Sequence, residues 1–132
     1  MYNARYRIRM IVFLDDIRMP SMSHREGKGL GDNYSELENW VIVRDYFEFK
    51  LIIDKYIDQI SLVSFDHDLS CYDGQTEYTG KSAAEYLINK CIEMKIKLPD
   101  WYVHSDNTSG KANIIGLILS YLKNVENIDV SI

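Results

Sequence analysis

Two carboxylates flank a histidine in the segment SFDHDLS, residues 64–70, directly after an apolar run. Asp66, His67 and Asp68 are costly to bury unless they are paired, hydrogen-bonded or bound to a ligand. A carboxylate can hold a hard cation or orient an imidazole, and an imidazole titrates close enough to neutral pH to transfer protons. This segment is therefore the first candidate for a functional site.

The elements that must position these groups follow from the apolar runs. The run at 7–14 becomes continuously apolar and β-branched, which is typical of a strand that is covered on both faces. The predicted strands lie at 7–14, 40–43, 60–65 and 101–104. Helical spacing of apolar residues occurs between them, with stripes at 46–57, 83–92 and 114–125, and the expected N-terminal caps are Ser82, paired with Glu85, and Ser109. This alternation predicts an α/β domain with a parallel sheet between layers of helices.

Ligand sites of open parallel sheets lie beyond the carboxyl ends of the strands. The polar residues that follow the predicted strands therefore lie together at the edge of the sheet where the carboxyl ends of the strands meet, which we call the rim. They are Asp15, Asp16, Asp66, His67, Asp68, His104 and Ser105. An aspartate after a strand is often only a turn former. Four together repel one another and raise each other's pKa unless a cation or a buried proton compensates. The rim is thus the predicted functional site.

Residues 17–35 hold three of the seven glycines and one of the two prolines, where a helix would otherwise join the first two strands, and this pattern predicts a long loop. The glycines at 27–31 lack the strand before and the Lys-Ser/Thr pair after that a phosphate loop requires, so we interpret them as part of a lid. His24 is expected to be exposed in the same loop. Arg18 and Arg44 each lie just beyond a strand end, where an arginine can bind a phosphate.

Composition limits the function classes. A chain of 132 residues, 46% hydrophobic, fits a single domain spanning residues 1–132. The net charge of −5 disfavours binding to DNA duplexes or other long nucleic acids, and leaves short nucleotides or RNA ends as ligands. No signal peptide or membrane-spanning run is found, and the two cysteines have dissimilar contexts, so we expect a cytoplasmic protein with no membrane partner.

The chain resembles a divergent group of receiver domains, the cyclic-phosphate-processing receiver-like domains. The resemblance runs through FLDDIRMP (13–20), WVIVRDYFEF (40–49), SFDHDL (64–69), TGKSAAEYL (79–87) and VHSDNTSGKANI (103–114). It implies a flavodoxin-like sheet with strand order 2-1-3-4 and helices on both faces. The only candidate fifth strand, 128–132, lacks the lysine that phosphorylated receivers need, which disfavours phosphorelay signalling.

The resemblance implies processing of a cyclic phosphate, and the residues suggest how. Carboxylates of Asp15, Asp16 and Asp66 are expected to bind Mg²⁺ or Mn²⁺. In this interpretation Asp68 orients His67, and His104 is the acid–base partner. The phosphate is expected to contact Arg18, Arg44, Ser105 and Asn107.

Two alternatives stay open. Asp66 could act as a nucleophile that forms an acyl phosphate instead of binding a cation. The rim could also belong to a non-catalytic module that holds a cyclic or phosphorylated nucleotide without converting it. The sequence does not choose between these possibilities, and it leaves the oligomeric state open.

Overall fold

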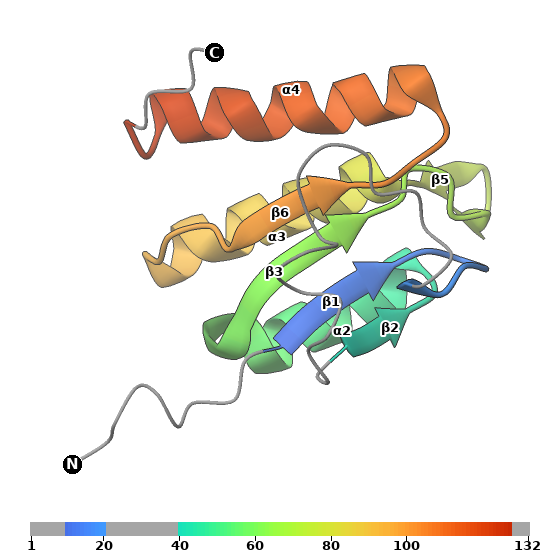
Figure 1. The fold of residues 1–132 in the computed structure, drawn as a ribbon, viewed down its shortest axis with the longest axis horizontal. Coiled ribbons are helices and arrows are strands. Elements are labelled where there is room, and N and C mark those ends of the chain that lie inside the picture. The colour runs from blue at the N-terminus through green and yellow to red at the C-terminus, as the bar shows by residue number, and fades with distance from the viewer. Residues whose placement is uncertain (1–9, 21–39, 128–132) are drawn as a thin grey trace.

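A computed structural model describes residues 10–20 and 40–127. Its main sheet contains four strands, β1 (Met10–Leu14), β2 (Trp40–Val43), β3 (Ile60–Phe65) and β6 (Asp100–Val103). They pair in parallel in the order β2-β1-β3-β6. Because β6 is the fourth strand of this sheet along the chain, this arrangement confirms the predicted order 2-1-3-4. The arrowheads in Figure 1 point the same way, so all four carboxyl ends meet at one rim.

The strand boundaries agree closely with the apolar runs. The second and third strands have the predicted bounds, and β6 starts one residue earlier and ends at Val103, before His104. Every residue of β1 is buried, as expected for an inner strand covered on both faces. Residues 7–9 of the predicted first strand, most of the predicted loop, including His24, and the candidate fifth strand at 128–132 lie outside the described residues.

The helices described beside the sheet, within residues 40–127, are α2 (Tyr46–Tyr56), the short 3₁₀ helix η3 (Ile57–Gln59), α3 (Gly80–Met94) and α4 (Thr108–Asn124). Figure 1 shows α2 and α3 behind the sheet and α4 alongside the β6 edge. The apolar stripes of all three helices join one core with Val12, Leu14 and Val63. The opposite face carries the cluster of Ile11 and Leu62, in which no described helix takes part.

Two helix caps differ from the predicted ones. Thr79 caps α3, and Ser82 is the third helical residue, whose hydroxyl accepts a hydrogen bond from the Thr79 amide at 3.0 Å. The predicted pairing of Ser82 with Glu85 is therefore wrong, because the helix starts earlier than its apolar stripe suggests. Asn107, not Ser109, caps α4. Both true caps lie at the rim and fix the helix starts beside the strand ends.

A small antiparallel hairpin, β4 (Cys71–Asp73) and β5 (Thr76–Tyr78), lies between β3 and α3 and was not predicted. Its two-residue loop contains Gly74 with a φ of 63°, a conformation that favours glycine. The Tyr78 ring stacks on Tyr46 of α2, with 4.6 Å between centroids. This contact anchors the hairpin against α2.

Two further findings bear on the chain's chemistry outside the rim. Cys71 and Cys91 are buried free thiols, and burial raises the pKa of Cys91 to about 11, so this thiol stays protonated and unreactive. Among the described residues, no helix has both the length and the apolar character that crossing a membrane requires.

Candidate functional site

A cavity of about 230 Å³ lies at the carboxyl ends of the strands. Seven of the residues predicted for the site line it: Asp15, Asp16, Arg18, Asp66, Asp68, Ser105 and Asn107. The other described lining residues are Ile17, Ser70 and Asp106. The described lining thus combines five carboxylates with one guanidinium, which makes this part of the cavity strongly acidic.

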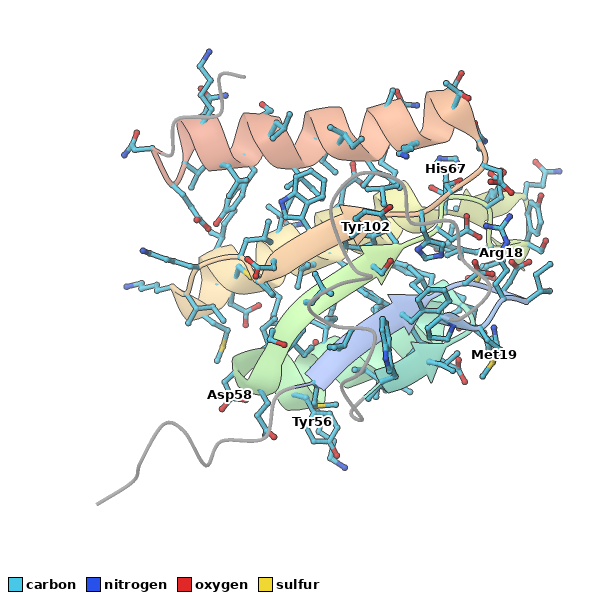
Figure 2. All side chains as sticks on the ribbon, viewed as in Figure 1. Arg18, Met19, Tyr56, Asp58, His67 and Tyr102 are labelled. Carbon is cyan, nitrogen blue, oxygen red and sulfur yellow. The ribbon has the colours of Figure 1, made fainter. Side chains whose placement is uncertain are left out.

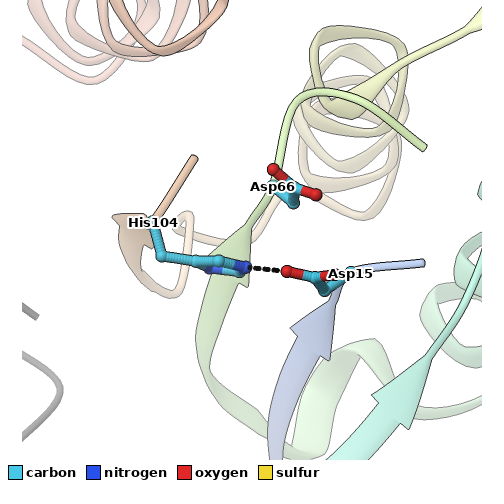
Figure 3. A group of neighbouring side chains, drawn as sticks. All are labelled: Asp15, Asp66 and His104. Atoms are coloured by element: carbon cyan, nitrogen blue, oxygen red, sulfur yellow. Dashed lines mark hydrogen bonds and ion pairs between the residues drawn. The ribbon is translucent and has the colours of Figure 1, made fainter. Parts of the chain in front are cut away.

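Asp15 directly follows β1 and is fully buried. Its Oδ1 accepts backbone hydrogen bonds from Ile17 at 3.0 Å and Arg18 at 2.8 Å, and its Oδ2 lies 3.0 Å from His104 Nε2 (Figure 3). Burial alone would raise the pKa of this carboxyl, but the hydrogen bonds from His104 and the two amides outweigh it and lower the pKa to about 2. Asp15 is therefore a fixed negative charge at neutral pH.

His104 lies beside Asp15 and is only 2% exposed (Figure 3). Its ring stacks on Phe13 with 4.4 Å between centroids, and its Nδ1 lies 2.7 Å from Ser64 Oγ. Because the Asp15 carboxylate only accepts, Nε2 must carry a proton, and both ring nitrogens are engaged within the protein. His104 therefore has no ring nitrogen available for the acid–base role beside His67 that the sequence suggested. Strand alternation explains the difference, since His104 follows Val103 and points to the face opposite the helices.

Asp66 directly follows β3 and is 7% exposed. Its Oδ1 accepts a hydrogen bond from the His67 amide at 2.8 Å. Burial, and then the negative charge of Asp15, raise the pKa of Asp66. Potential ligand atoms of Asp15, Asp66 and His104 lie within 4.8 Å of one another (Figure 3). Because Nε2 of His104 carries a proton directed at Asp15, the two carboxylates are the groups of this cluster that can hold a cation.

Asp16 differs from its neighbour because it is only partly buried and lines the cavity directly. Its carboxylate has no hydrogen-bond or ion-pair partner within residues 10–20 and 40–127. As far as residues 10–20 and 40–127 are concerned, its oxygens are therefore open to a ligand.

His67 is paired with Asp68 at the other side of the rim. His67 Nδ1 lies 2.8 Å from Asp68 Oδ1, and Asn107 Nδ2 donates to both oxygens of that carboxylate, at 3.1 and 3.2 Å. The hydrogen bond with His67, supported by Asn107, lowers the pKa of Asp68. Figure 2 shows His67 beside the start of α4. Its side chain is 16% exposed, and it contacts the cavity wall through Asp68 and Asn107.

The two predicted phosphate-binding arginines have different surroundings. Arg18 lines the cavity and forms an ion pair with Asp106. Arg44 does not line the cavity; its Nη1 donates to the carbonyl oxygens of Asp15 at 3.0 Å and Arg18 at 2.7 Å. Arg44 therefore fixes the backbone turn that follows β1, and in this structure it is not positioned to clamp a phosphate.

Ser105 and Asn107 lie in the loop between β6 and α4. Ser105 Oγ accepts a hydrogen bond from the Asn107 amide at 3.1 Å, and the Ser105 side chain also hydrogen-bonds to Asp66. Asn107 Oδ1 accepts from the Gly110 amide at 2.8 Å. These bonds tie the start of α4 to the cavity wall.

Two glycines allow close approaches at the starts of α3 and α4. Gly80 lets α3 approach the backbone of Asp66 and His67, and Gly110 lets α4 approach the His67 ring. A Cβ placed on Gly80 would lie 1.8 Å from the carbonyl oxygen of Asp66, and one on Gly110 would lie 2.3 Å from Cγ of His67. Neither residue was predicted as part of the site. Their signal in the sequence, a glycine within the first turn of a helix that follows a strand, is weak without the structure.

The family model for the cyclic-phosphate processing receiver domain matches residues 10–120 of the chain. This range contains all the predicted site residues. No curated protein and no solved structure matches the chain.

Proposed function

Because the chain belongs to the cyclic-phosphate processing receiver domains, we propose that it hydrolyses a cyclic phosphate on a nucleotide or an RNA end with a divalent cation bound. The observation that carries this proposal is the acidity of the cavity, where five carboxylates and one guanidinium are found among the described lining residues. Like charges at short range repel an anionic phosphate ester unless a cation is present. The cation and the phosphate are therefore expected to bind together.

The donor set fits a hard divalent cation. Asp15, Asp16 and Asp66 offer carboxylate oxygens, which Mg²⁺ and Mn²⁺ prefer. Asp66 is buried close to the charge of Asp15, which raises its pKa, and a cation would compensate this repulsion. When bound, the cation polarises the phosphoryl group and neutralises its charge.

We assign the proton transfer to His67. Asp68 only accepts hydrogen bonds when ionised, so the 2.8 Å contact keeps a proton on Nδ1 and leaves the lone pair of Nε2 free. Nε2 takes a proton from a water whose oxygen bonds to phosphorus, while one ring P–O bond breaks. The imidazolium then returns the proton to the alkoxide that leaves, and the product is a phosphomonoester.

His104 has a different role in this proposal. Its Nε2–H group donates to Asp15, and its ring is held by Ser64 and Phe13. We assign it as a positioning residue that keeps the Asp15 carboxylate oriented and charged. This positioning role replaces the acid–base role that the sequence suggested for His104.

A second form of the reaction uses Asp66 as the nucleophile. Its carboxylate oxygen would bond to phosphorus as one ring P–O bond breaks, and water would later hydrolyse the acyl phosphate. The two forms differ in whether a phosphorylated protein accumulates. Intact mass spectrometry of acid-quenched reactions distinguishes them.

The alternative function is a non-catalytic module that binds a cyclic or phosphorylated nucleotide. One observation favours it: neither His67 nor His104 is among the residues that line the cavity. A cavity whose described lining contains no histidine suits binding better than proton transfer by an imidazole.

The experiment that separates the two functions is product analysis. The protein is incubated with 2′,3′-cyclic and 3′,5′-cyclic nucleotides, with Mg²⁺ or Mn²⁺, and the products are resolved by chromatography. Hydrolysis predicts a phosphomonoester that requires the metal and is absent from a His67→Ala reaction. Recovery of unchanged nucleotide together with measurable binding would favour the binding module.

A further inference from the structure

Arg18 and Asp106 form an ion pair between the loops that follow β1 and β6, and both line the cavity (Figure 2 labels Arg18). The Arg18 side chain is 25% exposed and that of Asp106 is 74% exposed. The guanidinium therefore lies on the inner side of the pair, and the carboxylate lies on the solvent side.

Both ends of this ion pair start from fixed backbone. The Arg18 amide donates to Asp15 Oδ1 at 2.8 Å, and its carbonyl accepts from Arg44 Nη1 at 2.7 Å. On the other side, Asn107 follows Asp106 and caps α4 while its amide donates to Ser105. The pair can therefore open by rotation of the two side chains, with no change in the backbone of either loop.

Arg18 is the one cationic side chain that lines the cavity within the described residues. A guanidinium binds carboxylates and phosphates with the same planar set of donors, so one carboxylate can occupy the place of a phosphate. We propose that Asp106 competes with the phosphate of the ligand for Arg18 and thereby determines which anions bind. This inference rests on the proposed function in one respect, the phosphate nature of the ligand.

The competition has a consequence for substrate and product. A cyclic phosphodiester carries one negative charge, whereas the phosphomonoester that hydrolysis yields approaches two at neutral pH, since its second pKa is near 6. Repulsion by Asp106 grows with the charge of the ligand. Asp106 therefore weakens binding of the product more than binding of the substrate, and this difference favours product release.

The test compares phosphate affinities of four variants with that of the wild type. They are Asp106→Asn, Arg18→Gln, the double variant, and Asp58→Asn as a matched control. Figure 2 shows Asp58 at the opposite end of the sheet from Arg18. Inorganic phosphate is titrated into each protein at saturating Mg²⁺ by calorimetry, and a thermal melt of each confirms that it is folded.

We expect Asp106→Asn to bind phosphate about three- to tenfold more tightly, since it removes both an exposed ion pair and a like charge. Arg18→Gln should weaken binding, the double variant should show no gain over Arg18→Gln, and Asp58→Asn should match the wild type. Unchanged affinity in Asp106→Asn would overturn the competition. A gain that persists in the Arg18→Gln background would also overturn it, because the effect would then be one of general charge.

Turnover of cyclic nucleotides is measured on the same wild-type preparation. Turnover combined with equal phosphate affinities of wild type and Asp106→Asn would reject the competition and leave the proposed function intact. Tighter binding in Asp106→Asn without any turnover would support the competition and reject hydrolysis.

Discussion

Replacing Gly110 by alanine should displace His67. A Cβ at this position would lie 2.3 Å from Cγ and 2.5 Å from Nδ1 of the His67 ring. Carbon atoms in contact lie about 3.5–4.0 Å apart, so the ring must retreat by roughly 1 Å or more. A shift of that size breaks the 2.8 Å contact between His67 and Asp68. Overpacking of this kind costs about 1–3 kcal/mol of unfolding free energy.

Gly116→Ala is the matched control, because it makes the same change in the same helix. A Cβ on Gly116 meets no atom within 4 Å, and removing a glycine from a helix interior stabilises it by about 0.5–1 kcal/mol. The two variants should therefore differ by about 1.5–4 kcal/mol. At about 3–5 °C per kcal/mol for a chain of this length, their melting temperatures should differ by roughly 5–20 °C.

The assay is a pair of thermal melts followed by circular dichroism, with ring resonances of His67 recorded by NMR. Gly110→Ala should melt below the wild type, shift the His67 resonances and lose turnover at temperatures where it is folded. Gly116→Ala should melt at or above the wild type and keep both the resonances and the turnover. Equal melting temperatures and unchanged His67 resonances in the two variants would refute the packing of His67 on α4.

Three further predictions concern the cation, pH and the two histidines. Mg²⁺ or Mn²⁺ should raise the melting temperature of the wild type by mass action, and Asp15→Asn or Asp66→Asn should abolish the shift; equal shifts in all three would remove the cation from the site. The pKa of Asp15 falls from 3.8 to about 2 on folding, so its charge contributes about 2 kcal/mol of stability above pH 4 that is lost as pH falls towards 2. Urea unfolding from pH 5 to 2 should show a shallower decline for Asp15→Asn, and parallel declines would count against this pKa. His67→Ala should cut turnover by about two to four orders of magnitude at an unchanged melting temperature. His104→Ala should lower the unfolding free energy by about 1–3 kcal/mol, because it removes the buried hydrogen bonds that the His104 ring makes with Asp15 Oδ2 and Ser64 Oγ. A loss of turnover in His104→Ala at an unchanged melting temperature, with a lower stability of His67→Ala, would exchange the two roles.

The rim itself could be predicted from the sequence, because the apolar runs determine where parallel strands end. Asp15 and Asp66 follow β1 and β3 in the structure and lie at one cavity, as the runs implied. The hairpin was missed because its strands have three residues each, too short for a periodicity to show. Its Asp73-Gly74 pair is a turn signal that could have found it.

The direction of a side chain was harder to predict than its place along a strand. His104 was expected at the surface of the rim, yet its position after Val103 turns it into the sheet face beside Asp15. Arg44 was expected to bind phosphate, yet two carbonyl oxygens of a neighbouring loop bind it. Asp106 was not predicted for the cavity, since only the packing of two loops brings it to Arg18.

The central claim, cation-dependent hydrolysis in this cavity, is tested most directly by ³¹P NMR of a cyclic nucleotide incubated with wild-type protein or with Asp16→Asn in the presence of Mg²⁺. Asp16 has no partner among the described residues, so its replacement by the isosteric asparagine removes a ligand for the cation at little cost to the fold. We expect the wild type to convert the cyclic phosphate resonance to that of a monoester, and Asp16→Asn to lose this conversion at an unchanged melting temperature. A wild type that leaves the cyclic phosphate unconverted, or an Asp16→Asn variant as active as the wild type, would contradict it.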